Sequence, residues 1–345
     1  MREREYIALI SGDHPELGLG ELRSVLAVLG TESDPKPITD RLAVFRASHE
    51  QAKGVAARCA FVKEVIELML TADLDSIGSE IDVEQSCADS ITEPYAVRAI
   101  KLQGPKGLLR TEVERWIASA LERVRPELKV DLESPRSVFR AYITDGLVVG
   151  GLLVGVRDTA GLSRRAPVNR PFRLPSTLQP REARVMVNLS RTPIGTRLLD
   201  PFSGTGAILM EAASLGYDPV GIEVRTWIAR GSLRNLKAFD LNWSAEVIAG
   251  DSSSVPLRGR LVGVGGVATD PPYGKSTRVI GHSLADLVDS VIASLTELLG
   301  KGRRIVVAYP MGLTPPSTLT GAMVIERYSY RVHSALVRVI HVLQV

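Results

Sequence analysis

Cysteine is nearly absent from this chain of 345 residues, which contains only Cys59 and Cys87. Two cysteines cannot build a disulfide framework, and no C-x-x-C pair or cluster of histidine and cysteine predicts a zinc site. Long apolar runs are absent as well: LVGVGGVA is far shorter than a membrane-spanning helix, and no apolar segment of the signal-peptide kind follows the charged start MREREYIALI. We therefore expect a cytoplasmic protein that binds neither a metal nor a membrane.

A large excess of one charge is also missing. The formal net charge is only +3, from 42 Lys and Arg against 39 Asp and Glu, so the composition permits an anionic partner without requiring one. The distribution of charge is more informative, because residues 157–185 contain seven arginines and only two acidic residues. Prolines are interspersed among these arginines, so we predict an extended basic linker that contacts an anion. A loop that only faces solvent is the alternative.

The N-terminal part mixes short strands and helices without an internal repeat. Over residues 1–85, EYIALIS and RLAVFRAS predict strands, and apolar spacings of three and four residues predict helices over ELGLGELRSVLAVLG and over 49–70. Residues 86–156 repeat this mixture and end in two strands joined by a turn at Asp145-Gly146. The pattern predicts a ferredoxin-like α+β domain over 1–85 and a second small α+β domain over 86–156, both before the linker 157–185.

From residue 186 to residue 345 the pattern becomes regular. Five apolar strands alternate with helices between Arg197 and Pro310, which predicts a parallel, doubly wound α/β sheet. The last two segments, 322–332 and 334–345, have no helix between them and predict a closing antiparallel hairpin. Five β/α units followed by such a hairpin are typical of the seven-stranded, Rossmann-like domain of S-adenosylmethionine-dependent methyltransferases.

The segment LLDPFSGTG (198–206) is the first motif that indicates a binding site. Asp200 stands at the expected end of a strand, and Gly204-Thr205-Gly206 opens the next helix, so that the backbone can approach a ligand closely. The segment is not the G-x-G-x-x-G pattern, and Asp200 would repel a pyrophosphate. A carboxylate suits instead the α-ammonium of a methionyl group, which favours S-adenosylmethionine over NAD. We predict that Asp200, Phe202, Gly204, Thr205 and Gly206 bind this cofactor; a purely structural turn is the alternative.

Two further acidic residues follow the next two strands. Glu223 comes 23 positions after Asp200 and could accept hydrogen bonds from both ribose hydroxyl groups. Asp251 ends the third strand and could accept one from the adenine amino group, with the backbone N–H of Ser252 as a donor. Each has an ordinary explanation too, Glu223 as a carboxylate at a helix start and Asp251 as a cap of a turn or helix. The presence of Asp200 on the preceding strand favours the cofactor.

The segment ATDPPYGKST (268–277) ends the fourth strand, and neither of its prolines can extend a ladder in mid-sheet. The Asp270 carboxylate and the Pro271 carbonyl could accept hydrogen bonds from an exocyclic amine as its nitrogen attacks a methyl group. Pro272 would help to fix this geometry in advance, and Tyr273 could stack on the base. A base inside a helix cannot reach such a site, so the target must be flipped out or unpaired. An Asp-Pro turn that only ends the strand is the alternative.

With these residues in view, the chain resembles the archaeal tRNA (guanine-10, N2) methyltransferase family over nearly its whole length. The resemblance includes HPELGLGELRSVL, the stretch from YAVRAIKL to DGLVVGGLLV, the connector RPFRLPSTLQPREARVMVNLS, the two motifs above and the closing RVHSALVRVIHVL. Ser203 and Ala207 stand where Cys and Gly are frequent, Glu223 replaces the usual Asp, and Lys275 replaces a frequent Arg. None of these departures removes a function-bearing group, although a lysine cannot make a bidentate contact.

The resemblance implies a THUMP RNA-binding domain over 86–156 and an amino-methyltransferase domain over 186–345. It implies S-adenosylmethionine as cofactor, tRNA as partner and N2 of guanosine 10 as methyl acceptor, with one or two methyl groups added by a monomer that needs no protein partner. Thr177 and Leu178 of the connector are expected to line the cofactor groove. The residues expected to bind RNA are Arg164, Arg165, Arg170 and Lys275.

Three other functions are consistent with parts of the sequence. A related enzyme with a THUMP domain methylates guanosine 6 of tRNA. A DNA adenine-N6 methyltransferase would use the same DPPY chemistry but has no reason for a THUMP-like region. A non-catalytic RNA-binding protein would not need Asp200, Glu223 and Asp270. We also expect that deletion of residues 1–156 leaves a folded, cofactor-binding domain that fails on tRNA.

Overall fold

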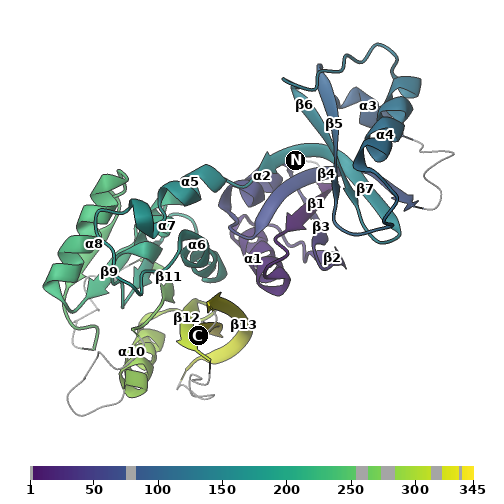
Figure 1. The fold of residues 1–345 in the computed structure, drawn as a ribbon. Coiled ribbons are helices and arrows are strands. Elements are labelled where there is room, and N and C mark those ends of the chain that lie inside the picture. Colours follow the sequence, from purple (N-terminus) through teal and green to yellow (C-terminus); the bar gives the residue numbers. More distant parts are fainter. Residues whose placement is uncertain (1–2, 75–82, 254–262, 273–283, 312–320, 334–335) are drawn as a thin grey trace. The chain divides into compact units, whose positions relative to one another are not determined.

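The structure is a computed structural model that describes residues 3–74, 83–253, 263–272, 284–311, 321–333 and 336–345. The chain forms two compact units, each with a seven-stranded sheet (Figure 1). Their segments are Met1–Pro15, Thr31–Ala57 and Val62–Arg157 for unit 1, and Glu16–Gly30, Arg58–Phe61 and Asp158–Val345 for unit 2. The division does not follow the order of the chain, because two segments of the N-terminal region belong to unit 2.

Unit 1 is an α+β unit with one sheet in the order β2-β3-β1-β4-β7-β6-β5. Only the β5–β6 pair of this sheet is parallel. Val113 and Ile117 of α4 pack with Tyr95 and Val97 of β5 in one buried cluster. The elements are β1 (Arg4–Ile10), β2 (Lys36–Thr39), β3 (Leu42–Ala47), α2 (His49–Arg58, all but its last residue), β4 (Val62–Asp73), α3 (Gln85–Asp89), β5 (Tyr95–Lys101), α4 (Arg110–Val124), β6 (Ser137–Ile143) and β7 (Leu147–Val156).

The helix predicted over 49–70 is wrong in its second half. Helix α2 ends at Arg58, and the residues from Val62 onward form strand β4. This strand lies between β1 and β7 and pairs with both. It includes the β-branched and fully buried Val62, Val65 and Ile66, which favour a strand. Pairing with two strands distant in sequence therefore overrides the local apolar spacing.

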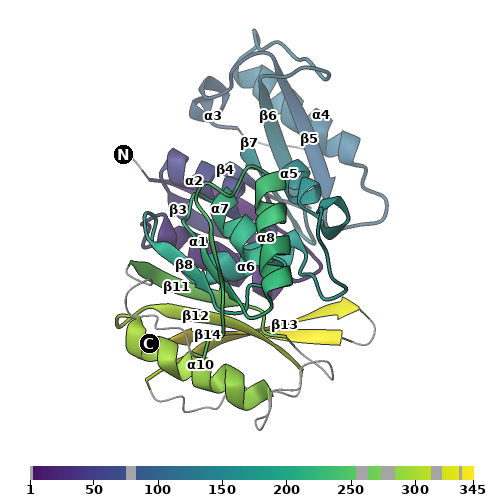
Figure 2. The same cartoon turned by 90° about the vertical axis from the view of Figure 1, so that its left-hand side faces the viewer.

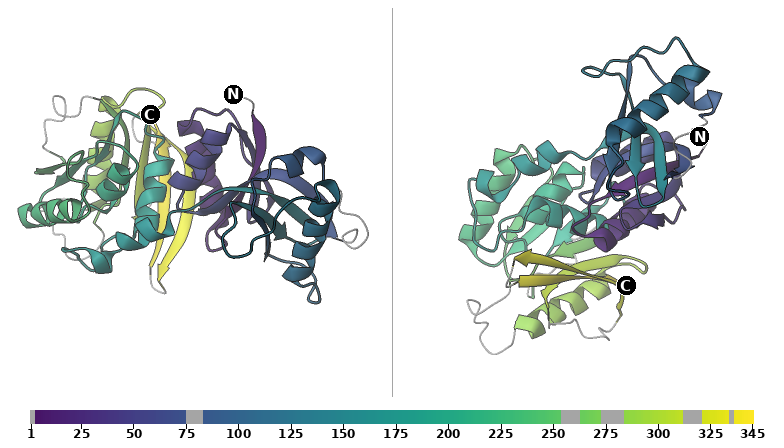
Figure 3. Two further views of the ribbon diagram at one scale, coloured as in Figure 1. Left: turned by 90° about the horizontal axis from the view of Figure 1, so that it is seen from above. Right: turned by 45° about the vertical axis from the view of Figure 1, so that its right-hand side comes forward.

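Unit 2 has the predicted doubly wound sheet, in the order β10-β9-β8-β11-β12-β14-β13. The strands from β10 to β12 are parallel, and β13 and β14 form the predicted antiparallel hairpin (Figure 3). The strands are β8 (Arg197–Asp200), β9 (Val220–Glu223), β10 (Glu246–Ala249), β11 (Val264–Thr269), β12 (Arg304–Pro310), β13 (Met323–His333) and β14 (Leu336–Gln344). The helices are α1 (Pro15–Val28), α5 (Thr159–Arg164), α6 (Pro180–Leu189), α7 (Ala207–Ser214), α8 (Thr226–Ala238) and α10 (Leu284–Leu298).

This sheet is covered on both faces, as a parallel sheet requires. Successive side chains of a strand point to opposite faces, so Leu198 of β8 packs with α6 and α7, whereas Leu199 packs with α10. Val306 and Val307 of β12 divide in the same way. Figure 2 shows α10 on one side of the sheet and α6 and α7 on the other. Across the described ranges, we find no helix with the length and apolar character that crossing a membrane would need.

Residues 157–185 do not form the extended linker that the sequence predicts. They contain α5, a 3-10 turn (Pro167–Asn169) and the first part of α6. Helix α6 begins at Pro180, a residue tolerated at the first helical position because the N–H it lacks would have no intrahelical partner. Its Ala183, Val185 and Met186 are fully buried. The segment is therefore a folded part of unit 2, and its last part, the start of α6, lies in the core.

Candidate functional site

Three acidic side chains lie at one edge of the parallel sheet in unit 2. Asp200 and Glu223 are the last residues of β8 and β9, and Asp270 directly follows β11. Strand β8 lies between β9 and β11 and is parallel to both, so all three strands end at the same edge. Burial raises the pKa of Asp200 most, and the charges of Asp270 and Glu223 raise it further, so both of these carboxyl groups lie close enough to act on Asp200. Open α/β sheets bind their ligands at this edge.

The loop from Ser203 to Gly206 is fastened to the strand and helix beside it. The Ser203 N–H donates to the Ile222 carbonyl of β9 at 2.9 Å, and Asn235 of α8 donates to the Thr205 carbonyl at 2.9 Å. Gly204 and Gly206 adopt positive φ angles of 50° and 84°. A Cβ on Gly206 would lie 2.3 Å from the Ser232 hydroxyl oxygen, so this glycine is required both by backbone angle and by space. The result is a rigid loop with no side chain at its two bends.

Asp200 is the most buried of the three carboxyl groups, with an exposed fraction of 2%. Its Oδ1 accepts hydrogen bonds from the Phe202 N–H at 3.1 Å and from the Thr269 hydroxyl at 2.7 Å. Both bonds fall on one oxygen, and no described residue donates to Oδ2. Burial raises the pKa of this group to about 7. A buried carboxylate with one oxygen that receives no hydrogen bond from the described residues fits a cationic ligand group, which would restore the lost solvation.

Glu223 and Asp251 each accept hydrogen bonds from the residue two positions later, which agrees with their alternative interpretation as caps of a turn or helix start. Glu223 accepts a hydrogen bond from the Arg225 N–H at 2.9 Å through Oε1. Asp251 is exposed and accepts from both the N–H and the hydroxyl of Ser253, at 2.9 and 2.8 Å. The buried Ser252 donates its hydroxyl to the Pro201 carbonyl, which connects the loop after β10 to the loop after β8. The turn bonds of both acids involve one carboxyl oxygen each, so the other oxygen can accept a ligand hydrogen bond.

The connector residues lie beside the glycine loop. The Thr205 hydroxyl donates to the Thr177 hydroxyl oxygen at 3.4 Å, and the Leu174 N–H donates to the same oxygen at 2.9 Å. Leu178 is buried with an exposed fraction of 5%, and its side chain belongs to the core cluster that includes Ala207 and Ile208 of α7. Thr177 therefore stands at the predicted cofactor loop, whereas Leu178 supports it from within.

Asp270 forms an ion pair that the sequence did not indicate. Its Oδ2 lies 3.1 Å from a guanidinium nitrogen of Arg338 in β14, and both side chains are largely buried. Arg338 is the cross-strand partner of Tyr330 in β13. Burial raises the pKa of Tyr330, and the charge of Asp270 raises it further. Pro271 is buried and Pro272 exposed. The arginine arrives from a strand 68 positions later, so no local pattern could reveal it.

Tyr273 and Lys275 lie outside the described residues.

Two of the three arginines of residues 157–185 that the sequence predicts to bind RNA are buried. Arg165 has an exposed fraction of 9% and Arg170 of 5%, whereas Arg164 is exposed. The Arg170 guanidinium donates to the carbonyls of Arg165 and Leu178, at 2.8 and 3.3 Å, and burial lowers the pKa of Arg170 to about 10.

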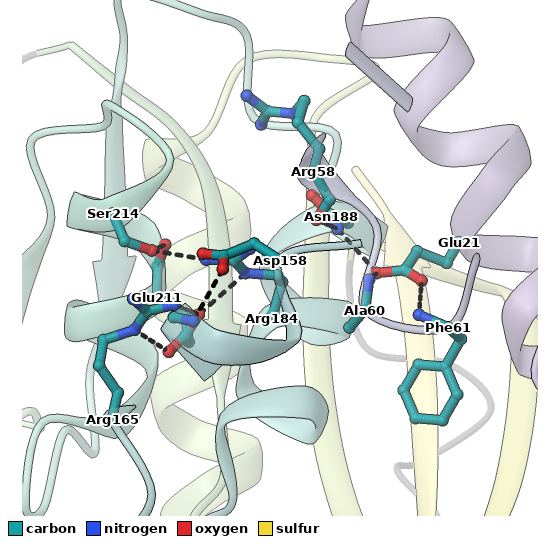
Figure 4. Close-up of polar contacts among 11 residues, drawn as sticks. Glu21, Arg58, Ala60, Phe61, Asp158, Arg165, Arg184, Asn188, Glu211 and Ser214 are labelled. Carbon is teal, nitrogen blue, oxygen red and sulfur yellow. Dashed lines mark hydrogen bonds and ion pairs between the residues drawn. The ribbon is translucent and has the colours of Figure 1, made fainter. Parts of the chain in front are cut away.

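Arg165 belongs to a buried network centred on Glu211 of α7 (Figure 4). Arg165 donates to both carboxyl oxygens of Glu211, at 2.7 and 3.0 Å. Arg184 of α6 donates to Glu211 at 2.8 Å and to the Ser214 hydroxyl at 2.8 Å. These bonds join the segment after α5 to α6 and α7. Burial thus assigns Arg165 and Arg170 to the fold, and an RNA contact by either side chain does not fit this placement.

Comparisons with known proteins agree with this arrangement. A family model described as UPF0020 (RMKL-like, methyltransferase domain) matches residues 167–340. The tRNA (guanine(10)-N2)-dimethyltransferase of Methanothermobacter thermautotrophicus is 34% identical over 344 residues, which are 99% of each chain. The enzyme of the same name from Methanocaldococcus jannaschii is 26% identical over 97% of this chain and 98% of its own. The crystal structure of TrmN from Thermus thermophilus matches the fold with a TM-score of 0.54 at 20% identity, over 99% of each chain.

Proposed function

The chain belongs to the UPF0020 family of RMKL-like methyltransferases, and we propose that it methylates the exocyclic N2 of guanosine 10 in tRNA. It is an S-adenosylmethionine-dependent tRNA (guanine-N2)-methyltransferase by its membership of this family and its similarity to the two archaeal enzymes. The observation that carries the proposal for the site is the convergence of Asp200, Glu223 and Asp270 at one edge of the sheet. The match to a guanosine-10 enzyme along 99% of both chains supports the choice of nucleotide.

We propose that the residues at the ends of β8, β9 and β10 bind the cofactor, which supplies an electrophilic methyl group. The buried Asp200 carboxylate would accept hydrogen bonds from the α-ammonium through Oδ2. Glu223 would accept from the ribose hydroxyl groups, and Asp251 from the adenine amino group beside the Ser252 N–H. The open glycine loop with Phe202, Thr205 and Thr177 would allow the close approach of the methionyl part. Positive φ angles at both glycines and the tight contact of Gly206 with Ser232 support this role.

We propose that Asp270 and the Pro271 carbonyl accept hydrogen bonds from the N2 amino group of the flipped guanine. These acceptors concentrate electron density on a nitrogen whose lone pair is otherwise delocalised into the ring. The Arg338 ion pair would hold the Asp270 carboxylate in one orientation, so little reorganisation is needed as the nitrogen attacks. No strong base is required, because the methylated nitrogen loses its proton readily. Tyr273 is proposed to stack on the base.

We propose that tRNA is held mainly by the N-terminal region, with residues 86–156 acting as a THUMP domain. These residues include β5, β6, β7 and α4 of unit 1, which form an α+β arrangement. Arg164 and Lys275 remain proposed RNA contacts in unit 2. We also propose that one chain acts without an obligate protein partner.

The methylated nucleotide decides between guanosine 10 and guanosine 6. A tRNA (guanine(6)-N2)-methyltransferase of Thermus thermophilus is 29% identical over 61% of this chain and 56% of its own. We expect nuclease mapping of a tRNA transcript, methylated with labelled S-adenosylmethionine, to locate the label at guanosine 10. A transcript with adenosine at position 10 is the matched control and should accept no methyl group. Label at guanosine 6 in both transcripts would refute the proposed position.

Replacing Asp200 by Asn is expected to lower the affinity for S-adenosylmethionine at least tenfold. The change removes the charge of a charge-assisted hydrogen bond, which is typically worth about 1.5–3 kcal/mol. Because the pKa of Asp200 is about 7, wild-type affinity should also fall as the pH drops through 7, and the Asp200→Asn variant should lack this dependence. Calorimetry from pH 6 to pH 8 measures both effects. Asp218→Asn, at an exposed position before β9, is the control.

The same substitution is expected to raise the melting temperature of the cofactor-free protein at pH 8. Burial places the folded-state pKa of Asp200 above its ordinary value, so this group destabilises the fold increasingly as the pH rises from about 4 to about 7. Asparagine has no charge to desolvate and should remove this cost. A melting temperature of Asp200→Asn at pH 8 equal to that of wild type would contradict this cost of burial. For the preceding prediction, an unchanged affinity of Asp200→Asn for S-adenosylmethionine would contradict the assigned role of the carboxylate.

A further inference from the structure

Helix α8 and the segment beside it present an exposed basic surface, of which the sequence analysis singled out only Arg164. Residues 224–239 contain four basic residues and no acidic residue. All four are exposed, and so are two arginines of the segment 164–173 that packs beside the helix. We call this set the α8 surface. Its basic members are Arg164, Arg173, Arg225, Arg230, Arg234 and Lys237, and the large apolar side chains exposed on α8 itself are Trp227 and Leu233.

The basic side chains of the α8 surface contact aromatic rings in two cases, Arg164 over Phe239 and Arg234 over Phe172, but they have no acidic partner among the described residues. None of the six forms an ion pair with any residue in the described ranges. In contrast, the buried Arg165, Arg184 and Arg338 of the same unit are all paired with carboxylates. Six cations without a paired acid produce a positive field, and this field is complementary to a polyanion.

Aromatic contacts fix the two parts of this surface together. The Phe172 ring lies edge to face with Trp227, with 5.8 Å between ring centroids, and the Arg234 guanidinium lies 5.6 Å from the Phe172 centroid. The Phe172 N–H donates to the Asn235 side chain at 2.9 Å, and a Cβ on Gly231 would lie only 2.1 Å from the Phe172 ring. The cations are therefore carried by a rigid platform.

Trp227 is the most unusual member of the set. Its exposed fraction is 54%, although one edge contacts Phe172. Large exposed aromatic rings among unpaired cations are the combination by which proteins bind single-stranded nucleic acid, because every base has a face on which a ring can stack. Trp227 is the second residue of α8, and it comes four positions after Glu223. The surface therefore begins next to the carboxyl edge of the sheet.

We propose that the α8 surface binds the phosphate backbone of the tRNA near the target nucleotide, with Trp227 stacking on an unpaired base. The inference rests on the proposed tRNA methyltransferase function and extends it, because it adds helix α8 and Trp227 to the proposed contact of Arg164 with RNA. Arginine and tryptophan also occur at protein interfaces, but six cations with no acidic partner among the described residues are complementary to a uniformly negative polyanion, and the phosphate backbone of RNA is one. In this proposal, the α8 surface of unit 2 binds the RNA next to the flipped base.

The test compares the salt dependence of tRNA binding in wild type and in the double variant Arg230→Gln, Lys237→Gln. Each lost phosphate contact should reduce the slope of log affinity against log salt by about one, so the double variant should lose roughly one to two. Its affinity for tRNA should fall at least about fivefold at moderate salt, with unchanged affinity for S-adenosylmethionine. Lys301→Gln is the matched control, because this exposed lysine precedes β12, three strands from β9 in the sheet.

A second pair of variants tests the stacking. Trp227→Ala should weaken tRNA binding at least fivefold without changing the salt slope, and Trp227→Phe should retain most of the affinity. A salt slope and an affinity equal to wild type in the double variant would overturn the proposal. If wild type itself neither binds nor methylates tRNA, the proposed function fails instead, so the two failures are distinguishable.

Discussion

Replacing Asp270 by Ala should abolish methyl transfer to tRNA and leave the affinities for tRNA and S-adenosylmethionine close to those of wild type. The proposed hydrogen bonds from N2 to Asp270 strengthen as positive charge develops on the attacking nitrogen, so their loss should appear in kcat rather than in binding. Removal of one preorganised group that stabilises developing charge typically costs about 10²–10³ in rate. Single-turnover methylation with saturating tRNA measures this effect directly.

The ion pair with Arg338 complicates this variant, because Asp270→Ala leaves a buried guanidinium without its carboxylate. Asp270→Asn preserves the side-chain volume and one oxygen, and a melting curve shows whether each variant is folded. Asp218→Ala, at an exposed position of the same unit, is the activity control. A single-turnover rate near wild type in a folded Asp270→Ala variant would refute the catalytic role, whereas the rate of Asp270→Asn shows how much of that role needs the charge rather than the acceptor oxygen.

Replacing Glu21 by Ala should strongly destabilise unit 2, although Glu21 belongs to the N-terminal part of the sequence. This carboxylate is fully buried and accepts hydrogen bonds from the N–H groups of Ala60 and Phe61, both at 2.7 Å. It also accepts one from the Asn188 side chain of α6 at 2.8 Å (Figure 4). The variant would remove the Glu21 acceptor from three buried donors, and the loss of such a buried hydrogen bond costs about 1–3 kcal/mol. The free energy of unfolding should therefore fall by about 3 kcal/mol or more.

Chemical denaturation measures this loss, and Glu16→Ala is the matched control because Glu16 is exposed on the same helix. The structure also revises the expected result of deleting residues 1–156. That deletion removes Leu17, Ala60 and Phe61 from the cluster that packs on α6. We now expect the remaining fragment to be unstable, rather than to be a folded cofactor-binding domain. A fragment that melts cooperatively and binds S-adenosylmethionine, or a Glu21→Ala variant as stable as Glu16→Ala, would contradict this expectation.

The sequence alone determined the features that depend on neighbours along the chain. Apolar strands that alternate with helices predicted the doubly wound sheet of unit 2, and the absence of a helix between the last two strands predicted the β13–β14 hairpin. Acidic residues at the ends of successive strands predicted that Asp200, Glu223 and Asp270 would meet. Parallel strands end at one edge of a sheet, so this inference needed only the order of the elements.

The tertiary structure decided what depends on residues distant in sequence. The spacing of apolar residues in β4 predicts a helix, because this spacing fits a helix as well as a strand. The pairing of β4 with β1 and β7, which makes it a strand, is not visible in the sequence. The sequence predicts that Arg165 and Arg170 bind RNA from a basic linker, yet both are buried, and Arg165 pairs with Glu211. Arg338 reaches Asp270, and Glu21 reaches Asn188, only after folding. A charge in a sequence has no fixed role until packing determines whether water, a carboxylate or a ligand surrounds it.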